Sequence, residues 1–421
     1  MLFKKECKKI LFSVTFLLFL FGISGFFFSQ FMGDTGEAEE APMKGLDDYG
    51  MIVKEDPDIL MPAAVKALLN NYSVNTYTAY PVGFYKQVKL RDRKKDEMTD
   101  ILTELTGLTR DELEKYTAPV TNSGTVNENG EFVPAAASEN DTDDISVSST
   151  LTYDRFNELM NKADKIIGGG SDYSTQNLIN TFSLIPATYE DKLAEYNSLT
   201  DNDNIFTSYS RLFCDYIGIP LSILPVFICT AFCLKDKKNQ MQQLIYTRKI
   251  SSSRLIITRY LSVIAMTLIP AAVSMILAAI HISDLYPGNA SHILTFFVLP
   301  AVWLIPAITF SSALAMLITE ATSSMLAVLI QGVMWFVSLS SSIGNLTGST
   351  KLFTFIIRHN SVYDDAAFTN TLSTFYLNRI IYFLLSAALI IACAQIYELK
   401  RRGKFYEFKG FAVHNKNKSE A

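Results

Sequence analysis

The chain has 421 residues, of which 49% are hydrophobic, and its formal net charge of −5 hides two parts of opposite charge. Residues 33–205 contain 15 Lys and Arg against 32 Asp and Glu, a net of −17, whereas the rest of the chain has a net of +12. A basic apolar part joined to an acidic part excludes a single soluble globule. It indicates a membrane protein with one large extramembrane domain.

The first apolar segment, Ile10–Met32, is long enough to cross a bilayer, which takes about 20 residues in helical form because lipid cannot hydrogen-bond the backbone. Four lysines precede it between positions 4 and 9. A secretory signal starts in the same way, but its apolar run is shorter and ends in a small-residue cleavage site. This run continues without such a site through three consecutive phenylalanines. We therefore predict an uncleaved anchor.

Residues 33–205 follow this anchor and contain none of the five cysteines, so no disulfide can stabilise the domain. Apolar stripes at helical spacing from Met98 to Leu105 and from Phe156 to Ile167 predict two helices whose stripes form core. The second helix is predicted to end at Gly168–Gly170. The segment Tyr80–Leu90 is predicted to be a strand or an extended connector. Residues 119–150 are rich in Ser, Thr, Asn and Asp and are predicted to be a flexible insert. We expect a mostly helical domain of two lobes.

Five further apolar segments follow this domain, and each is long enough to span a bilayer. Their approximate bounds are 212–234, 255–280, 293–318, 325–343 and 380–396. The predicted fold is therefore an all-α polytopic membrane protein. It has about six transmembrane helices, with a mostly helical extracellular domain inserted between the first and the second.

Lysine and arginine predict the orientation, because they accumulate in cytoplasmic segments. Seven lie between Lys235 and Arg259, and seven more lie in the tail that begins at Lys400, whereas residues 281–292 have none. We expect a multi-pass protein of the cell membrane with both termini in the cytoplasm. Residues 1–32 would be the basic start and helix one, residues 206–400 would carry helices two to six, and residues 401–421 would be a cytoplasmic tail.

Motifs for catalysis are absent from the sequence, which has no phosphate-binding loop, no G-x-S-x-G and no H-E-x-x-H. His281 and His292 share a loop but have no third partner, so we do not predict a metal site. Cys229 and Cys233 lie one helical turn apart in an apolar run and are predicted to be buried apolar residues. The chain is expected to be no enzyme, to hold no cofactor and to bind no nucleic acid.

The segment 235–254, between the second and third spans, carries the most informative pattern. Met241, Leu244 and Ile245 recur at helical spacing among charged residues, and Ser251–Ser253 can cap the next helix. We predict a short amphipathic helix at the cytoplasmic face. It is either an interfacial basic loop or a docking element for a soluble partner.

Polar residues inside spans are costly and are therefore candidates for function. Asp215 lies one turn after Arg211, and we expect the two to form an ion pair at the outer end of the second span. Gln331, with Trp335 one turn later, either faces a central cavity or makes an interhelical hydrogen bond.

The arrangement of one span, a large outer domain, five more spans and a cytoplasmic helix after the second span resembles permeases of type-2 ATP-binding-cassette exporters. The pair Leu244 and Ile245, the stretch Ile250–Arg254, and Arg259 are similar to the later part of that family's inner segment. The acidic residue and glycine usual there are replaced by residues 240–243. The resemblance covers the membrane part of the chain.

This resemblance implies that segment 236–253 is a coupling helix that inserts into a separate ABC ATPase, which would use the ATP. The implied coupling residues are Met241, Leu244, Ile245, Arg248 and Arg254. Two six-helix subunits would pair as a homodimer or a heterodimer. The loop 345–374 would be either a re-entrant piece or an ordinary interfacial loop.

The expected function is thus that of the membrane subunit of an ATP-driven exporter. Two alternatives are a membrane-anchored extracellular sensing or binding protein and a secondary transporter. The number of spans exceeds what an anchor needs, and we find neither the paired intramembrane charges nor the inverted repeats expected of a secondary transporter.

Overall fold

The computed structural model describes residues 2–81, 85–115, 125–126, 132–133, 147–175, 177–200, 204–342, 350–363 and 365–404. The chain divides into two compact units. Residues 1–41 and most of the chain from Leu193 onward form a helical bundle, and residues 42–192 form an inserted domain. The inserted domain is thus narrower than the predicted 33–205. Most of the predicted insert 119–150 and the tail beyond Lys404 lie outside the described residues.

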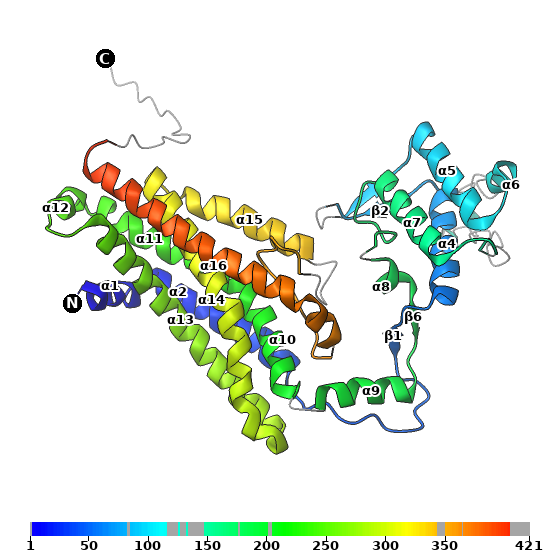
Figure 1. The fold of residues 1–421 in the computed structure, drawn as a ribbon, viewed down its shortest axis with the longest axis horizontal. Helices are drawn as coiled ribbons and strands as arrows, with labels where there is room; N and C mark the ends of the chain where they lie inside the picture. Colours follow the sequence, from blue (N-terminus) through cyan, green and yellow to red (C-terminus); the bar gives the residue numbers. More distant parts are fainter. Residues whose placement is uncertain are drawn as a thin grey trace, which may run out of the picture. The chain divides into compact units, whose positions relative to one another are not determined.

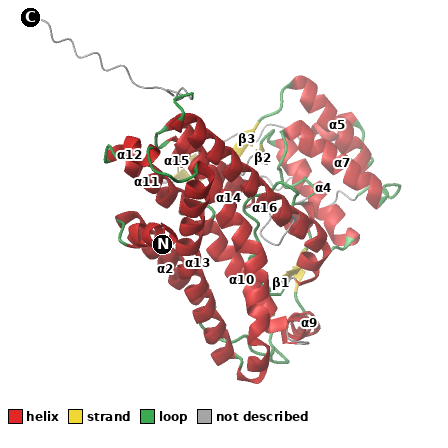
Figure 2. Cartoon of the chain, turned by 60° about the vertical axis from the view of Figure 1, so that its left-hand side comes forward, coloured by secondary structure: helices red, strands yellow, loops and turns green. Residues whose placement is uncertain are grey.

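The bundle contains five helical segments that are long and apolar enough to cross a membrane. They are Val14–Asp34, Ile205–Lys238, Ser252–Leu285, Ser291–Thr322 and Ala367–Arg401. The remaining predicted span forms the shorter apolar helix α15 (Leu326–Ser342), of 17 residues. Figures 1 and 2 show these helices side by side, and the all-α polytopic membrane fold is confirmed.

The start of the first span differs from the prediction. Residues Leu2–Leu11 form a separate helix, α1, and the span begins with α2 (Val14–Phe26). The Ser13 hydroxyl causes the break, since it donates to the carbonyl oxygen of Ile10 at 2.7 Å and accepts from the backbone N–H of Phe16. Ile10 therefore belongs to α1 and not to the span. The span continues through the π-helical η1 (Phe27–Phe31) and α3 (Met32–Asp34).

The second span is bent, because Pro225 lacks the backbone N–H that would continue the first helix into the next. Its two halves are α10 (Asn204–Leu221) and α11 (Pro225–Lys238). The remaining helices of the bundle are α12 (Gln242–Tyr246), α13 (Ser252–Leu285), η4 (Pro287–Phe297), α14 (Val298–Thr322) and α16 (Asp365–Arg401). Helix α16 starts well before the predicted residue 380.

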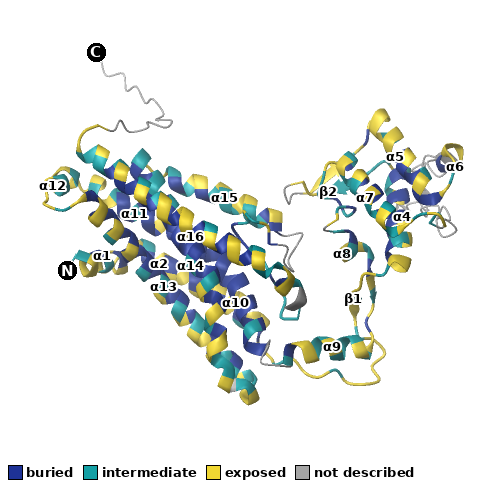
Figure 3. Cartoon of the chain, in the orientation of Figure 1, coloured by how far each residue is buried: buried dark blue, intermediate teal, exposed yellow. Residues whose placement is uncertain are grey.

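Helix α14 forms the centre of the bundle and packs against α10, α11, α13, α15 and α16. Trp303 on α14 is the largest of the fully buried side chains. The buried residues gather along the middle of the bundle in Figure 3, whereas large apolar residues such as Leu18, Leu329 and Leu384 are exposed on its outside. Exposed apolar side chains on spanning helices are expected where the solvent is lipid.

Helices α1 and α12 and the last turn of α16 lie at one end of the bundle, which we call the basic end (Figure 1). Most of the lysines and arginines of the bundle lie in α1, in residues 235–259 and in residues 400–404. Helix α10 begins at the opposite end, where η4 also lies.

The inserted domain is mostly helical, with short antiparallel ladders. Its helices are α4 (Pro57–Ser73), α5 (Asp92–Thr106), α6 (Arg110–Lys115), α7 (Tyr153–Ile167), α8 (Leu178–Phe182) and α9 (Tyr189–Thr200), the last crossing its boundary. The ladders pair β1 (Met51–Val53) with β6 (Leu184–Pro186), β2 (Tyr77–Ala79) with β3 (Lys86–Val88), and β4 (Thr125–Val126) with β5 (Phe132–Val133).

The two predicted apolar stripes form a single core, so the expectation of two lobes is wrong. Met98 and Leu102 of α5 are fully buried in the same cluster as Phe156 and Met160 of α7. The role of the stripes as core faces is confirmed. Their separation in sequence by a long polar segment suggested two lobes, but α5 and α7 pack against each other directly.

The predicted end of α7 at the three consecutive glycines is confirmed. At one of them, Gly170, no other residue fits. Gly170 has a φ of 70°, and a Cβ there would lie 2.5 Å from the carbonyl oxygen of Tyr80. Its own carbonyl oxygen accepts from the backbone N–H of Tyr80 at 3.0 Å. A side chain at this position would therefore separate the turn after α7 from the residue that follows β2.

Candidate functional site

The segment between the second and third spans is less helical than predicted. Its first residues extend α11 to Lys238, and Gln240 adopts a left-handed conformation with a φ of 56°. Only Gln242–Tyr246 form the short helix α12. Ser251 caps α13 by accepting from the backbone N–H of Arg254 at 3.3 Å, as the sequence predicts.

The apolar residues of this segment divide into two kinds. Met241 is 44% exposed and Leu244 is 54% exposed, although both lie outside the spanning segments. Ile245 is half-buried and packs against the bundle core. Met241 and Leu244 therefore form the accessible apolar surface of the segment, and Ile245 anchors it.

Arg401 of α16 holds the segment in place. Its guanidinium donates to the carbonyl oxygens of Tyr246, Arg248 and Ile250 at 2.9, 2.8 and 2.6 Å. The ring of Tyr246 also packs edge-on against Tyr397, with centroids 5.5 Å apart. A planar guanidinium with five donors can satisfy several carbonyls at once. The short helix is thus fixed to the end of the last span.

Further polar contacts join the other helix ends at the basic end. The Ser252 hydroxyl donates to Glu398, which pairs with Arg402 at 2.7 Å. Lys400 donates to the Ser323 hydroxyl at 2.7 Å, in the turn between α14 and α15. These contacts connect α13, α16 and the α14–α15 turn.

A buried ion pair joins the end of the second span to the start of the third. Arg259 of α13 pairs with Asp236 of α11, and the guanidinium also lies 5.8 Å from the Phe232 ring centroid. This pair joins α11 to α13 at the basic end, where Arg401 joins the segment after α12 to α16.

Arg248, Lys249 and Arg254, in the same stretch of the chain as the two accessible apolar residues, are also exposed. We call Met241, Leu244 and these three cations the α12 surface, which combines exposed apolar side chains with exposed positive charge. It carries no pair of groups arranged for acid–base chemistry. No cluster that could hold a metal ion occurs among the described residues, and His281 Nε2 donates to the carbonyl oxygen of Thr35 at 2.6 Å. Such a surface is suited to binding another protein.

Asp215 has a different partner from the one predicted. Its Oδ1 accepts from Arg358 Nε at 2.8 Å and from the backbone N–H of His359 at 2.7 Å. Arg211 instead donates to the Ser208 hydroxyl and to the carbonyl oxygen of Val362, at 3.2 and 3.3 Å. The i,i+4 spacing allowed the predicted pair, but the segment after α15 supplies a guanidinium that reaches the carboxylate from another element.

Residues 350–363 have no helix and fold into the bundle. Phe355, Ile356 and Ile357 are buried, although the backbone around them makes no regular ladder. Irregular backbone is tolerated at membrane depth only where protein satisfies its polar groups. This packing supports the re-entrant interpretation of the loop 345–374, of which residues 345–349 and 364 lie outside the described residues.

Two polar residues of α16, which the sequence analysis missed, satisfy this backbone. Asn378 Nδ2 donates to the carbonyl oxygens of Lys351, Leu352 and Thr354 at 3.1, 2.9 and 2.9 Å. Arg379 Nη2 donates to the carbonyl oxygen of Phe355 at 3.2 Å. One signal in the sequence could have found them. Phe368, Leu372 and Phe375 recur at helical spacing, which indicates that the last helix begins before the predicted residue 380 and contains Asn378 and Arg379.

Gln331 and Trp335 both make interhelical hydrogen bonds. Gln331 Nε2 donates to the carbonyl oxygen of Ser311 at 2.9 Å, and its Oε1 accepts from the Ser311 hydroxyl at 3.2 Å. Trp335 Nε1 donates to the carbonyl oxygen of Ile219 at 3.0 Å. The hydrogen-bonded alternative is therefore the one observed, and α15 is fixed to α14 and α10.

Cys229 and Cys233 are buried free thiols, as predicted. No curated protein and no solved structure matches this chain. The model of the ABC-2 family transporter protein matches residues 8–358, which is most of the chain and includes the α12 surface. The chain therefore belongs to the ABC-2 transporter family and is a multi-pass membrane protein with the role of a transport permease.

Proposed function

We propose that this chain is the membrane subunit of an ATP-driven exporter, that it forms the translocation pathway, and that a separate ABC ATPase docks on the α12 surface. The observation that carries the proposal is the exposure of Met241 and Leu244 on a segment that Arg401 fixes to the last span. Apolar side chains exposed beyond the spans gain free energy when a partner covers them. Family membership provides the transport role.

The basic end faces the cytoplasm in this proposal, because lysine and arginine accumulate on that side. Both termini are then cytoplasmic and the inserted domain is extracellular. ATP-driven closure of the ATPase would move α12, and the contacts of Arg401 and Arg259 would pass that movement to α16 and α13. The nucleotide is bound by the partner subunit. Two permease subunits, either two copies of this chain or this chain and a related one, would enclose the pathway.

Copurification in mild detergent tests the docking. The natural chain is expected to recover an ATPase that mass spectrometry identifies by its own phosphate-binding loop. Leu244→Asp should weaken this association about thirtyfold, because an uncovered leucine side chain loses about 2 kcal/mol of burial. Met241→Asp should act in the same direction. Ile245→Asp is unsuitable as a test, because Ile245 packs against the bundle core.

Gln243→Asp is the matched control, since Gln243 is exposed on the same short helix and the substitution adds the same charge without removing apolar surface. It should retain most of the ATPase. Equal recovery with Leu244→Asp and the natural chain, with membrane insertion intact, would exclude the α12 surface as the docking site.

A further inference from the structure

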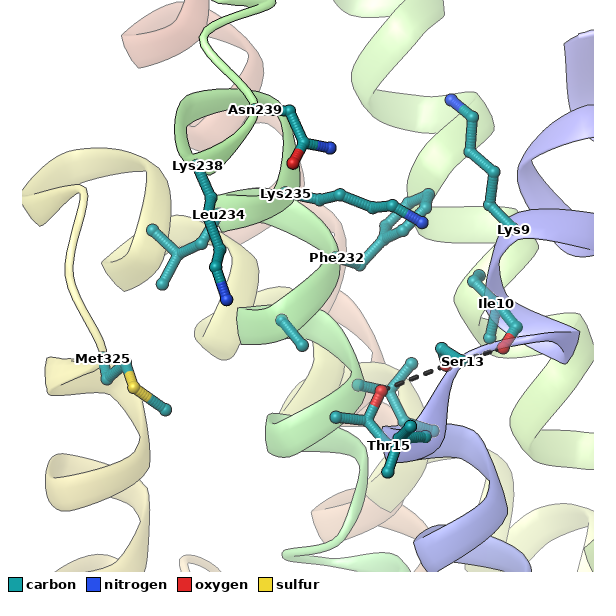
Figure 4. Close-up of a pocket in the computed structure, with 13 residues that line it drawn as sticks. Lys9, Ile10, Ser13, Thr15, Phe232, Leu234, Lys235, Lys238, Asn239 and Met325 are labelled. Atoms are coloured by element: carbon teal, nitrogen blue, oxygen red, sulfur yellow. Dashed lines mark hydrogen bonds between the residues drawn. The ribbon is translucent and has the colours of Figure 1, made fainter.

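A cavity of about 470 Å³ opens at the basic end of the bundle. It lies between the junction of α1 and α2, the last turns of α11 and the start of α15 (Figure 4). Lys9, Lys235 and Lys238 contribute its charged lining, and Val14, Ala231 and Phe232 are among its apolar lining residues. The cavity is separate from the α12 surface, whose residues do not line it.

The charge of the cavity is positive. No Asp or Glu is among the described residues that line it. Glu6 pairs with Lys9 at 2.9 Å and offsets that one charge, whereas Asp236, next to Lys235 in the chain, is engaged by Arg259. Lys235 and Lys238 therefore supply most of the positive charge that faces the cavity, and Figure 4 shows Lys235 extending toward the α1 side.

The cavity lies where the spans meet charged sequence. Val14 is the first residue of the first span, and Lys238 is the last of the second. The cavity wall is apolar along Ile228, Ala231 and Phe232, one to three turns before Lys238 on the same bent span. A phospholipid has this distribution of chemistry, with an anionic phosphate at the interface and acyl chains beneath it.

We propose that the cavity binds an anionic phospholipid of the leaflet at the basic end. Lys235 and Lys238, which extend to opposite sides of α11 in Figure 4, attract the phosphate by their charge, Asn239 offers an amide donor, and the first part of an acyl chain lies against Ala231 and Phe232. A free phosphate ion would leave the apolar wall uncovered, and a neutral apolar ligand would leave the lysines without an anionic partner. The bound lipid fills the space between α2, α11 and α15. This site requires no ATPase and stands independently of the proposed function.

Native mass spectrometry of the full chain tests this proposal. The protein is reconstituted in nanodiscs with equal amounts of phosphatidylglycerol and phosphatidylcholine, and the lipid that remains bound after release is identified. The natural protein is expected to retain phosphatidylglycerol in preference to phosphatidylcholine. In Lys235→Gln/Lys238→Gln the preference should fall about fivefold for each lysine removed, the usual contribution of a basic residue near an anionic surface.

Lys4→Gln/Lys237→Gln is the matched control, because it removes the same charge from α1 and α11 at positions that do not line the cavity. It should retain the preference. Ala231→Trp fills the apolar wall and should reduce retention of either lipid while leaving the lysines in place. Lys235 and Lys238 are exposed, so their substitution leaves the bundle core intact.

Three results would overturn the proposal. Equal retention of the two lipids by the natural protein would show that the cavity does not select an anionic headgroup. An equal loss in the control variant would assign the preference to the general charge of the basic end. Displacement of phosphatidylglycerol by millimolar inorganic phosphate, with no effect of Ala231→Trp, would identify a soluble anion as the ligand.

Discussion

Arg401, in the last turn of α16, donates a hydrogen bond from Nε to the carbonyl oxygen of Tyr246 at the end of α12, across an N···O distance of 2.9 Å. The two residues are 155 positions apart in the sequence. A helix of five residues is too short to be stable by itself. The position of α12 therefore depends on this contact and on the two other carbonyls that the guanidinium reaches.

Replacement of Arg401 should loosen the segment that follows α12. Arg401→Gln loses most of the charge-assisted hydrogen bonds to backbone carbonyls, and the free energy of local opening should fall by about 2 kcal/mol. Arg401→Lys keeps the charge but loses the planar fork, so its effect should be intermediate. Hydrogen–deuterium exchange of residues 242–251 in the full chain measures the opening. Arg402→Gln, on the neighbouring exposed pair, should leave that exchange unchanged.

Replacement of Asn378 should release residues 350–363 from the bundle. Asn378→Asp places a carboxylate against three carbonyl oxygens that accept from the amide in the natural protein, which we expect to cost about 3 kcal/mol. A cysteine introduced as Ile356→Cys, buried in the natural protein, should then react with a membrane-impermeant maleimide. Asn370→Asp on the exposed face of the same helix is the control. Unchanged reactivity in Asn378→Asp would contradict the role of Asn378.

The ion pair of Asp215 and Arg358 should show the asymmetry of a buried pair. Asp215 is fully buried and the Arg358 side chain is 11% exposed, so Asp215→Asn leaves a guanidinium without its counter-charge and should destabilise the bundle by about 3–5 kcal/mol. The double variant Asp215→Leu/Arg358→Met should be more stable than either single variant. Thermal unfolding in detergent measures the three. Arg402→Gln, on the exposed side of the Arg402–Glu398 pair, should cost less than about 1 kcal/mol.

The inserted domain should lose stability in acid through Glu104. Arg155 of α7 donates to both carboxylate oxygens of Glu104 on α5, at 2.5 and 2.9 Å, and these hydrogen bonds lower the pKa of Glu104. Because the folded pKa lies below the unfolded one, the contribution is present above the ordinary pKa of 4.5 and is lost as the pH falls below it. The pair is exposed, so its contribution is at most about 1 kcal/mol.

Glu104→Gln should accordingly increase hydrogen–deuterium exchange in α5 and α7 at pH 7 and have no effect at pH 3. Glu97→Gln is the control, since Glu97 pairs with Arg93 on the same helix and joins no second element. An equal effect of Glu104→Gln at both pH values would show that Glu104 acts through packing and not through its charge.

The sequence predicted those features that depend on neighbouring residues. The apolar runs placed five spans and the shorter α15, since the length of an apolar run is a local property. Ser251 predicted the start of α13, and the glycines after Ile167 predicted the end of α7, because caps act over a few residues. The apolar stripe of α7 predicted which face is buried.

Tertiary structure decided the partners of the polar side chains. By sequence, Asp215 had Arg211 one turn away, but the folded chain brings Arg358 to it from 143 positions along the chain. In the same way, Asn378 of α16 satisfies the carbonyls of Lys351, Leu352 and Thr354, which lie 24 to 27 positions before it in the chain. A buried charge or a bare backbone carbonyl must find a partner, and spacing along one helix does not show which distant element supplies it. The sequence by itself therefore determined which segments form the long apolar helices, whereas only the folded bundle determined which side chains hold them together.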